Sequence, residues 1–171
     1  MSQINVNTIA LADGTEQARL VQVQTVNKTT GFTTTSSTPV DITDFEVDIT
    51  PTNAANKILV IVSGVMGNGS TGGYPCECKL VRVISGGATS NIAMGTSASD
   101  GTNNYTIFSI LDTSWNTIPV NVVFLDSPNT TNEVTYKLQI EAGGGNAVWG
   151  RRGDDTTYSA HSSTTVMEIR T

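Results

Sequence analysis

The sequence has few of the residues that carry enzyme chemistry. Its 171 residues include one histidine, His161, and two cysteines, Cys76 and Cys78. Nucleophilic catalysis needs a base within hydrogen-bond reach of a serine or cysteine. The serines near His161 are its sequence neighbours in an extended segment, and such neighbours rarely form a catalytic triad. A zinc site needs four ligands, usually Cys and His. We therefore expect no catalytic residue, no metal site and no cofactor.

Charged residues and long apolar runs are also scarce. Charged residues make up 14% of the chain, with a net charge of −6 and a pI near 4.5. An acidic chain lacks the basic face that nucleic acid or an anionic membrane surface requires. The longest purely apolar run, residues 58–62, is far shorter than the roughly 20 residues of a membrane-spanning helix. We expect no nucleic-acid partner and no membrane partner.

The start of the chain and the cysteines indicate the compartment. Met1 is followed by neither a basic region nor an apolar segment, so we expect no secretory signal. Cys76 and Cys78 are separated by one residue, and a disulfide at that spacing is strained. We interpret them as free thiols of a protein made in a reducing cytosol.

Small polar and β-branched residues are abundant. Thr (27), Ser (15), Asn (14) and Gly (16) together account for 72 residues, and Val, Ile and Thr for 57. β-Branched side chains favour strands over helices. Strand-like stretches recur, separated by Gly, Asn, Ser and Pro. We predict strands at residues 20–26, 45–49, 57–66, 78–84, 91–94, 105–111, 118–124, 134–140, 146–149 and 164–169.

Several of these stretches alternate between apolar and polar residues. The clearest is 134–140, and the nearly continuous apolar run 57–66 predicts a central strand buried on both sides. Without crossover helices, the sheets must be mainly antiparallel. The sequence therefore predicts an all-β fold, an antiparallel β-sandwich of the jelly-roll type over residues 20–171.

Residues 1–19 differ from the rest. Four apolar residues stand there among Asn and Thr, too few to form a core: Ile4, Val6, Ile9 and Leu11. We expect this segment to be an extended N-terminal arm that attaches the sandwich to a partner.

Other candidate contacts are weaker. Trp115 and Trp149 are candidates for stacking on a glycan or for a partner contact, although each also suits packing at the end of a sandwich. The adjacent Asp154 and Asp155 follow two arginines, which favours local charge compensation over a calcium site or a partner contact. The acidic residues within 41–48 are typical of the solvent side of a strand.

Three stretches of the sequence carry a family resemblance. They read ITP followed by NKILV (49–51 and 56–60), LDSP followed by TYKLQI (125–128 and 135–140), and STTVMEI (163–169). In order and spacing they resemble a widespread domain of bacteriophage virion proteins. The opening INVNTI (4–9) is similar to the N-terminus of phage fibre proteins.

The resemblance implies a C1q/TNF-like jelly-roll domain that forms homotrimers, with no enzyme activity and no cofactor. Such domains often end long tail fibres, whereas here about 19 residues precede the matched region. We therefore expect a virion protein assembled in the host bacterial cytoplasm, namely a capsid decoration protein or short head fibre. Its expected partners are itself and the major capsid protein or another virion protein.

Two alternatives remain open. The chain could be the tip of a tail fibre that recognises host surface glycans, or an enzyme such as a depolymerase, although no convincing acid pair is evident. A trimer axis could lie near apolar residues not used in the core, such as Val123, Phe108 or Ile110. His161 is then either a surface imidazole or a residue that three copies bring together at that axis.

Overall fold

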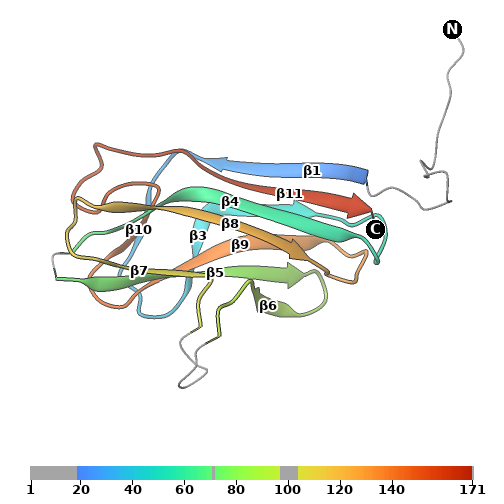
Figure 1. Ribbon diagram of the computed structural model, residues 1–171, viewed down its shortest axis with the longest axis horizontal. Coiled ribbons are helices and arrows are strands. Elements are labelled where there is room, and N and C mark those ends of the chain that lie inside the picture. The colour runs from blue at the N-terminus through green and yellow to red at the C-terminus, as the bar shows by residue number, and fades with distance from the viewer. Residues whose placement is uncertain (1–18, 71, 97–103, 171) are drawn as a thin grey trace, which may run out of the picture.

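Alternating apolar and polar side chains give two antiparallel β-sheets that pack face to face (Figure 1). The structure is a computed structural model that describes residues 19–70, 72–96 and 104–170. The first sheet contains β1 (Arg19–Lys28), β2 (Phe32–Thr34), β4 (Lys57–Asn68), β8 (Thr117–Asp126), β10 (Ala147–Trp149) and β11 (Ser162–Arg170). The second sheet contains β3 (Val40–Ile49), β5 (Tyr74–Ile84), β6 (Thr89–Ile92), β7 (Ile107–Leu111) and β9 (Val134–Ala142).

Every strand pair within these residues is antiparallel, and they contain no helix. The predicted fold class, an all-β antiparallel sandwich, is confirmed. β4 is the central strand of the first sheet, with β11 and then β10 along one edge and β8 along the other. β5 and β9 form the centre of the second sheet, flanked by β3, β6 and β7.

The core lies between the two sheets. β8 and β9 direct alternate residues into it, as the sequence pattern predicts. The largest fully buried side chains are Trp149, Tyr136 and Phe45, and the rings of Trp149 and Phe45 lie 5.5 Å apart. Such aromatic side chains bury large apolar areas, which is the main stabilising contribution to a fold with few charges.

Trp149 fits into the core because its ring lies close to the backbone of β4. The indole lies against β4 at Gly64, where an added Cβ would come within 2.4 Å of the ring. Glycine lacks that atom, so the ring can lie directly on the strand backbone.

The prediction that residues 57–66 are buried on both sides is wrong for the isolated chain. Ile58, Val60 and Val62 are fully buried, but the alternate residues Leu59 and Ile61 face outward and are only partly buried. β4 is central within its sheet, yet the second sheet covers only one of its faces.

The sandwich has two distinct ends. Arg19 pairs with Arg170 at one end, which we call the arm end because residues 1–18 precede it. β4 runs from this end to Asn68, and β8 returns from Thr117. We call the opposite end, where β4 finishes and β8 begins, the loop end (Figure 1).

Candidate functional site

The predicted arm falls almost entirely outside the described residues. Its four apolar residues, Ile4, Val6, Ile9 and Leu11, all belong to the part of the chain that the structure does not describe. Of the arm as predicted, Arg19 alone is described, and it is the first residue of β1. The arm and its binding role therefore remain predictions.

The two tryptophans occupy opposite environments. Trp149 is fully buried, with 0% of its surface exposed. Its ring packs against Phe45 and β4, so no part of it can contact a glycan or a partner, and the interpretation of Trp149 as such a contact is wrong. Trp115 is 67% exposed at the loop end and remains a candidate contact.

Trp115 belongs to a cluster with an arginine between two aromatic rings. The guanidinium carbon of Arg152 lies 4.2 Å from the ring centre of Trp115 and 4.1 Å from that of Tyr158, which is 62% exposed. Stacking of this kind holds an aromatic ring by cation–π attraction. The residues come from the loop before β8 and the segment between β10 and β11, which sequence spacing alone does not bring together.

Two carboxylates neutralise the stacked arginine. Asp154 and Asp155 each place an oxygen 2.7 Å from a guanidinium nitrogen of Arg152. The hydrogen bond from Arg152 lowers the pKa of Asp155 to about 2, helped by the backbone N–H of Thr157. The prediction of local charge compensation is confirmed, and the lowered pKa keeps Asp155 ionised at neutral pH.

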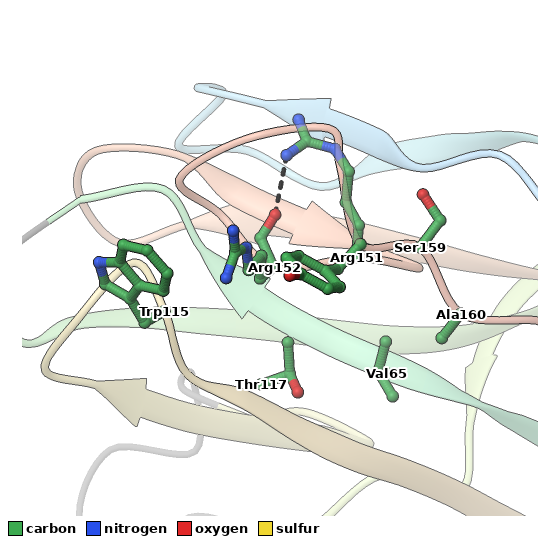
Figure 2. A pocket seen from close by; sticks show the side chains of 8 residues that line it. Val65, Trp115, Thr117, Arg151, Arg152, Ser159 and Ala160 are labelled. Atoms are coloured by element: carbon green, nitrogen blue, oxygen red, sulfur yellow. Dashed lines mark hydrogen bonds between the residues drawn. The ribbon is translucent and has the colours of Figure 1, made fainter.

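A pocket of about 200 Å³ adjoins the cluster (Figure 2). Arg151 is fixed beside it by donating hydrogen bonds to the carbonyl oxygens of Arg152 and Asp155 and to the hydroxyl of Thr33. The described residues that line it include no carboxylate, cysteine or histidine: Val65, Trp115, Thr117, Arg151, Arg152, Tyr158, Ser159 and Ala160. This composition suits contact with a planar or sugar-like surface better than acid–base chemistry.

The cysteines and the histidine take no part in this pocket. Cys76 and Cys78 are free, as predicted, and both are buried on the same face of β5. Burial raises the pKa of Cys76 to about 12 and raises that of Cys78 well above its usual value, so both stay un-ionised and unreactive. His161 is exposed, and its Nε2 lies 3.1 Å from the side-chain oxygen of Asn27.

A buried carboxylate joins two of the motif stretches at the arm end. Glu168 is fully buried and accepts hydrogen bonds from the backbone N–H and hydroxyl of Thr52, the amide of Asn56 and the amide of Gln22, at 2.6–2.8 Å. Burial alone would raise its pKa, but these hydrogen bonds outweigh burial and hold the pKa below 4.5. Glu168 is therefore a structural anion.

A second buried carboxylate joins the two sheets nearby. Asp126 at the end of β8 receives two hydrogen bonds from Arg82 of β5, at 2.8 and 3.0 Å, and one from the hydroxyl of Tyr136 of β9, at 2.7 Å. Burial, together with this carboxylate, raises the pKa of Tyr136. The LDSP motif contains Asp126, but the motif alone did not predict this role.

The described residues contain no group of three or more His, Cys, Asp and Glu side chains that could hold a metal ion. In the same part of the chain, no helix is long and apolar enough to cross a membrane.

Comparison with known proteins gives only a distant likeness. No protein-family profile and no curated protein matches the sequence. Three solved structures are similar to 99% of the chain. The structure of the Gx strain of infectious bursal disease virus has 17% sequence identity, a TM-score of 0.38 and 44% of its own chain covered. For T=1 particles derived from infectious bursal virus these values are 16%, 0.41 and 43%, and for the VP2 subviral particle of infectious bursal disease virus they are 17%, 0.38 and 42%. The chain thus spans less than half the length of those chains, and at these values the likeness supports no argument about function.

Proposed function

We propose that this chain is a non-enzymatic structural protein of a bacteriophage virion, a homotrimeric capsid decoration protein or short head fibre. Its N-terminal arm, residues 1–19, binds the major capsid protein or another virion protein through Ile4, Val6, Ile9 and Leu11. The sandwich then stands outward from the particle.

The observation that carries this proposal is the meeting of the three motif stretches in space. Glu168 pairs with Ile58, and Ile58 pairs with Asp126, so all three stretches share one row of the first sheet. The hydrogen bond from Asn56 to Glu168 joins the first and third stretches, and the bond from Tyr136 to Asp126 joins the two halves of the second. Pairing of β8 with β4 joins the second stretch to the first at the arm end. The matched residues thus act as one structural unit, which supports descent from one domain type over chance similarity of separate segments.

The polarity of the sandwich also supports the proposal. Arg19 lies at the arm end, whereas the exposed Trp115 lies at the loop end, so the two ends present different surfaces. A segment that leaves one end can attach to a particle while the other end faces solvent. Several arms on one oligomer would raise the effective concentration of each attachment.

The test is binding of the full chain to virions. The tagged protein is mixed with particles of the phage that encodes it, prepared without this chain, and the bound fraction is measured by co-sedimentation. We expect the unaltered chain to bind and the double variant Ile4→Asp, Val6→Asp to lose most of that binding, because both substitutions place a charge in an apolar contact.

The matched control is Asn5→Asp, Asn7→Asp, which adds the same two charges at the interleaved positions. It should retain binding if the apolar side chains make the contact. Equal binding by both variants would contradict the assignment of the arm, and no binding by the unaltered chain would contradict the virion role.

The exposed cluster at the loop end favours a second candidate function, recognition of host surface glycans. Trp115 and Tyr158 are both largely exposed beside a pocket, and Arg152 holds their rings in place. Aromatic rings of this kind can stack on the apolar faces of sugars.

This second candidate is tested by binding of the full chain to an array of bacterial surface glycans. Saturable binding that Trp115→Ala abolishes would support it. Phe108→Ala is the control, since Phe108 is equally exposed, at 66%, on the other sheet. Failure to bind any glycan, or equal loss with the control, would refute this role for Trp115.

A further inference from the structure

The two sheets present very different outer faces to solvent. On the second sheet, β3, β5 and β9 present charged side chains outward that form ion pairs across strands, whereas β7 exposes Phe108 and Ile110. Lys137 lies 2.7 Å from Asp41, and Lys79 lies 3.4 Å from Glu141. A polar outer face is the usual arrangement for an antiparallel sheet that packs on its core with one side only.

The outer face of the first sheet is apolar toward the arm end. Strand register places two rows of outward residues side by side across β1, β11, β4 and β8. These rows, which we call the apolar band, are Val23, Met167, Leu59 and Leu125, followed by Thr25, Thr165, Ile61 and Val123. Val123 is 69% exposed, Leu125 48% and Val23 44%.

Charge is nearly absent from this face. Among the outward positions of β4, β8 and β11 that the register defines, Lys57 alone is charged. Monomeric proteins rarely expose a contiguous apolar surface of this kind, and such surfaces mark interaction sites. The band also explains why residues 57–66 read as a strand buried on both sides: β4 is apolar on both of its faces, yet only one is covered.

We propose that the apolar band is the self-association surface of this chain and that a second copy of the same chain covers it. The proposal rests on the oligomeric virion protein proposed above and assigns the face through which it assembles. It also places Val123 at the interface and excludes Phe108 and Ile110, which lie on the second sheet.

Electrostatics favours a second copy as the occupant. The chain carries a net charge of −6, so two copies repel each other, and a contact that brings acidic residues together adds to this repulsion. The second sheet presents Asp41, Glu46 and Asp48 outward on β3, all exposed. The apolar band is the face that identical copies can bring together without burying repelling charges.

The size of the face is also adequate. The outer face of the first sheet is four strands wide and follows β4 for the ten residues, 58–67, that pair with β8. At about 4.8 Å between strands and about 3.4 Å per residue, this face measures roughly 19 by 34 Å, or about 650 Å² before pleating, and the apolar band forms its part toward the arm end. A standard interface buries about 800 Å² on each partner.

The experiment compares two equally exposed residues on opposite sheets. Val123 and Phe108 are 69% and 66% exposed, so aspartate at either position leaves the core intact. The mass of the full chain is measured by light scattering after size exclusion, up to millimolar protein. We expect the unaltered chain and Phe108→Asp at a multiple of 18.0 kDa, three for the trimer, and Val123→Asp at 18.0 kDa with unchanged circular dichroism.

A second experiment uses cysteine variants to identify what covers the apolar band. Cys76 and Cys78 are buried, so Val123→Cys and Phe108→Cys each introduce one reactive thiol. We expect the thiol at position 123 to be protected from a maleimide at high protein concentration and exposed on dilution, and the thiol at 108 to react at every concentration. Protection that does not change on dilution, in an 18.0 kDa species, would mean that the chain's own N-terminal segment covers the band, and it would overturn the proposal.

Two other results would overturn it. One is an unaltered chain of 18.0 kDa at millimolar protein, and the other is a multimer that Val123→Asp leaves intact. Virion binding is measured separately. A multimer that depends on Val123 but does not bind particles would refute the proposed function and leave the interface standing. A monomer that binds particles would refute the interface and the homotrimer and leave the virion role standing.

Discussion

Replacing Glu168 by glutamine tests the buried hydrogen-bond network at the arm end. The side chain keeps its shape but loses its charge. Oε1 accepts three hydrogen bonds, two from Thr52 and one from Asn56, and Oε2 accepts one from Gln22. A glutamine can keep its oxygen in the place of Oε1. Gln22 can accept from the new NH₂ group only by turning its amide, which breaks the hydrogen bond from its Nε2 to the carbonyl of Thr50.

The expected cost follows from the loss of charge on those bonds. A hydrogen bond to a charged group contributes about 1.5–3 kcal/mol, against about 0.5–1.5 kcal/mol for a neutral one. Three weakened bonds would cost about 3 kcal/mol, and removing a buried charge recovers part of this because desolvation falls. We expect Glu168→Gln to lower the free energy of unfolding by about 2 kcal/mol at neutral pH.

The pH dependence makes this prediction specific. The pKa of Glu168 in the folded chain lies below its ordinary value of 4.5, so its ionised form favours folding. That contribution is complete above pH 4.5 and is lost as the pH falls through the folded pKa. The difference between the unaltered chain and the variant should therefore shrink in acid.

The assay is urea unfolding at one fixed protein concentration, since self-association would add concentration-dependent stability. Glu46→Gln is the control, because Glu46 is an exposed carboxylate on β3 and should change stability by less than about 0.5 kcal/mol. Equal stability of Glu168→Gln and the unaltered chain at neutral pH, or a cost that stays constant in acid, would refute this account.

Two further predictions concern the core. Gly64→Ala should destabilise the fold by about 1–3 kcal/mol, because its methyl group meets the ring of Trp149, and a shifted tryptophan emission spectrum should accompany the loss; native emission and stability would contradict the close approach. Cys76 and Cys78 should resist a thiol reagent in the folded chain and react together, two per chain, in urea; labelling under native conditions would contradict their burial.

Much of the fold follows from local patterns. Residues 134–140 alternate cleanly and form β9 as predicted, because one face of the strand packs in the core and the other meets solvent. β2, Phe32–Thr34, was missed because its three residues show no alternation, and it exists through pairing with the distant β10.

The contacts that carry charge were harder to predict. Glu168 and Asp126 are acidic residues in a polar sequence, and their burial depends on donors from several other segments. Sequence reading identified the motifs that contain them but not their hydrogen bonds. The aromatic stacking on Arg152 likewise depends on how two loops meet at the loop end.

The prediction of Trp149 as a surface contact failed for a related reason. A three-residue strand gives too short a pattern to show which side faces the core, and the close approach at Gly64 settles it. Conversely, the predicted burial of residues 57–66 on both sides failed for the single chain but pointed to the apolar band. A strand whose sequence is apolar on both faces, but which is buried on only one face in the single chain, indicates an assembly surface.

We propose above that this chain is a structural component of a virion, attached through its N-terminal arm. The most direct measurement is quantitative mass spectrometry of purified virions of the phage that encodes it, with the unaltered chain or with Ile4→Asp, Val6→Asp. The account predicts a fixed number of copies per particle for the unaltered chain and a large loss for the variant. Absence of the chain from purified particles would contradict it.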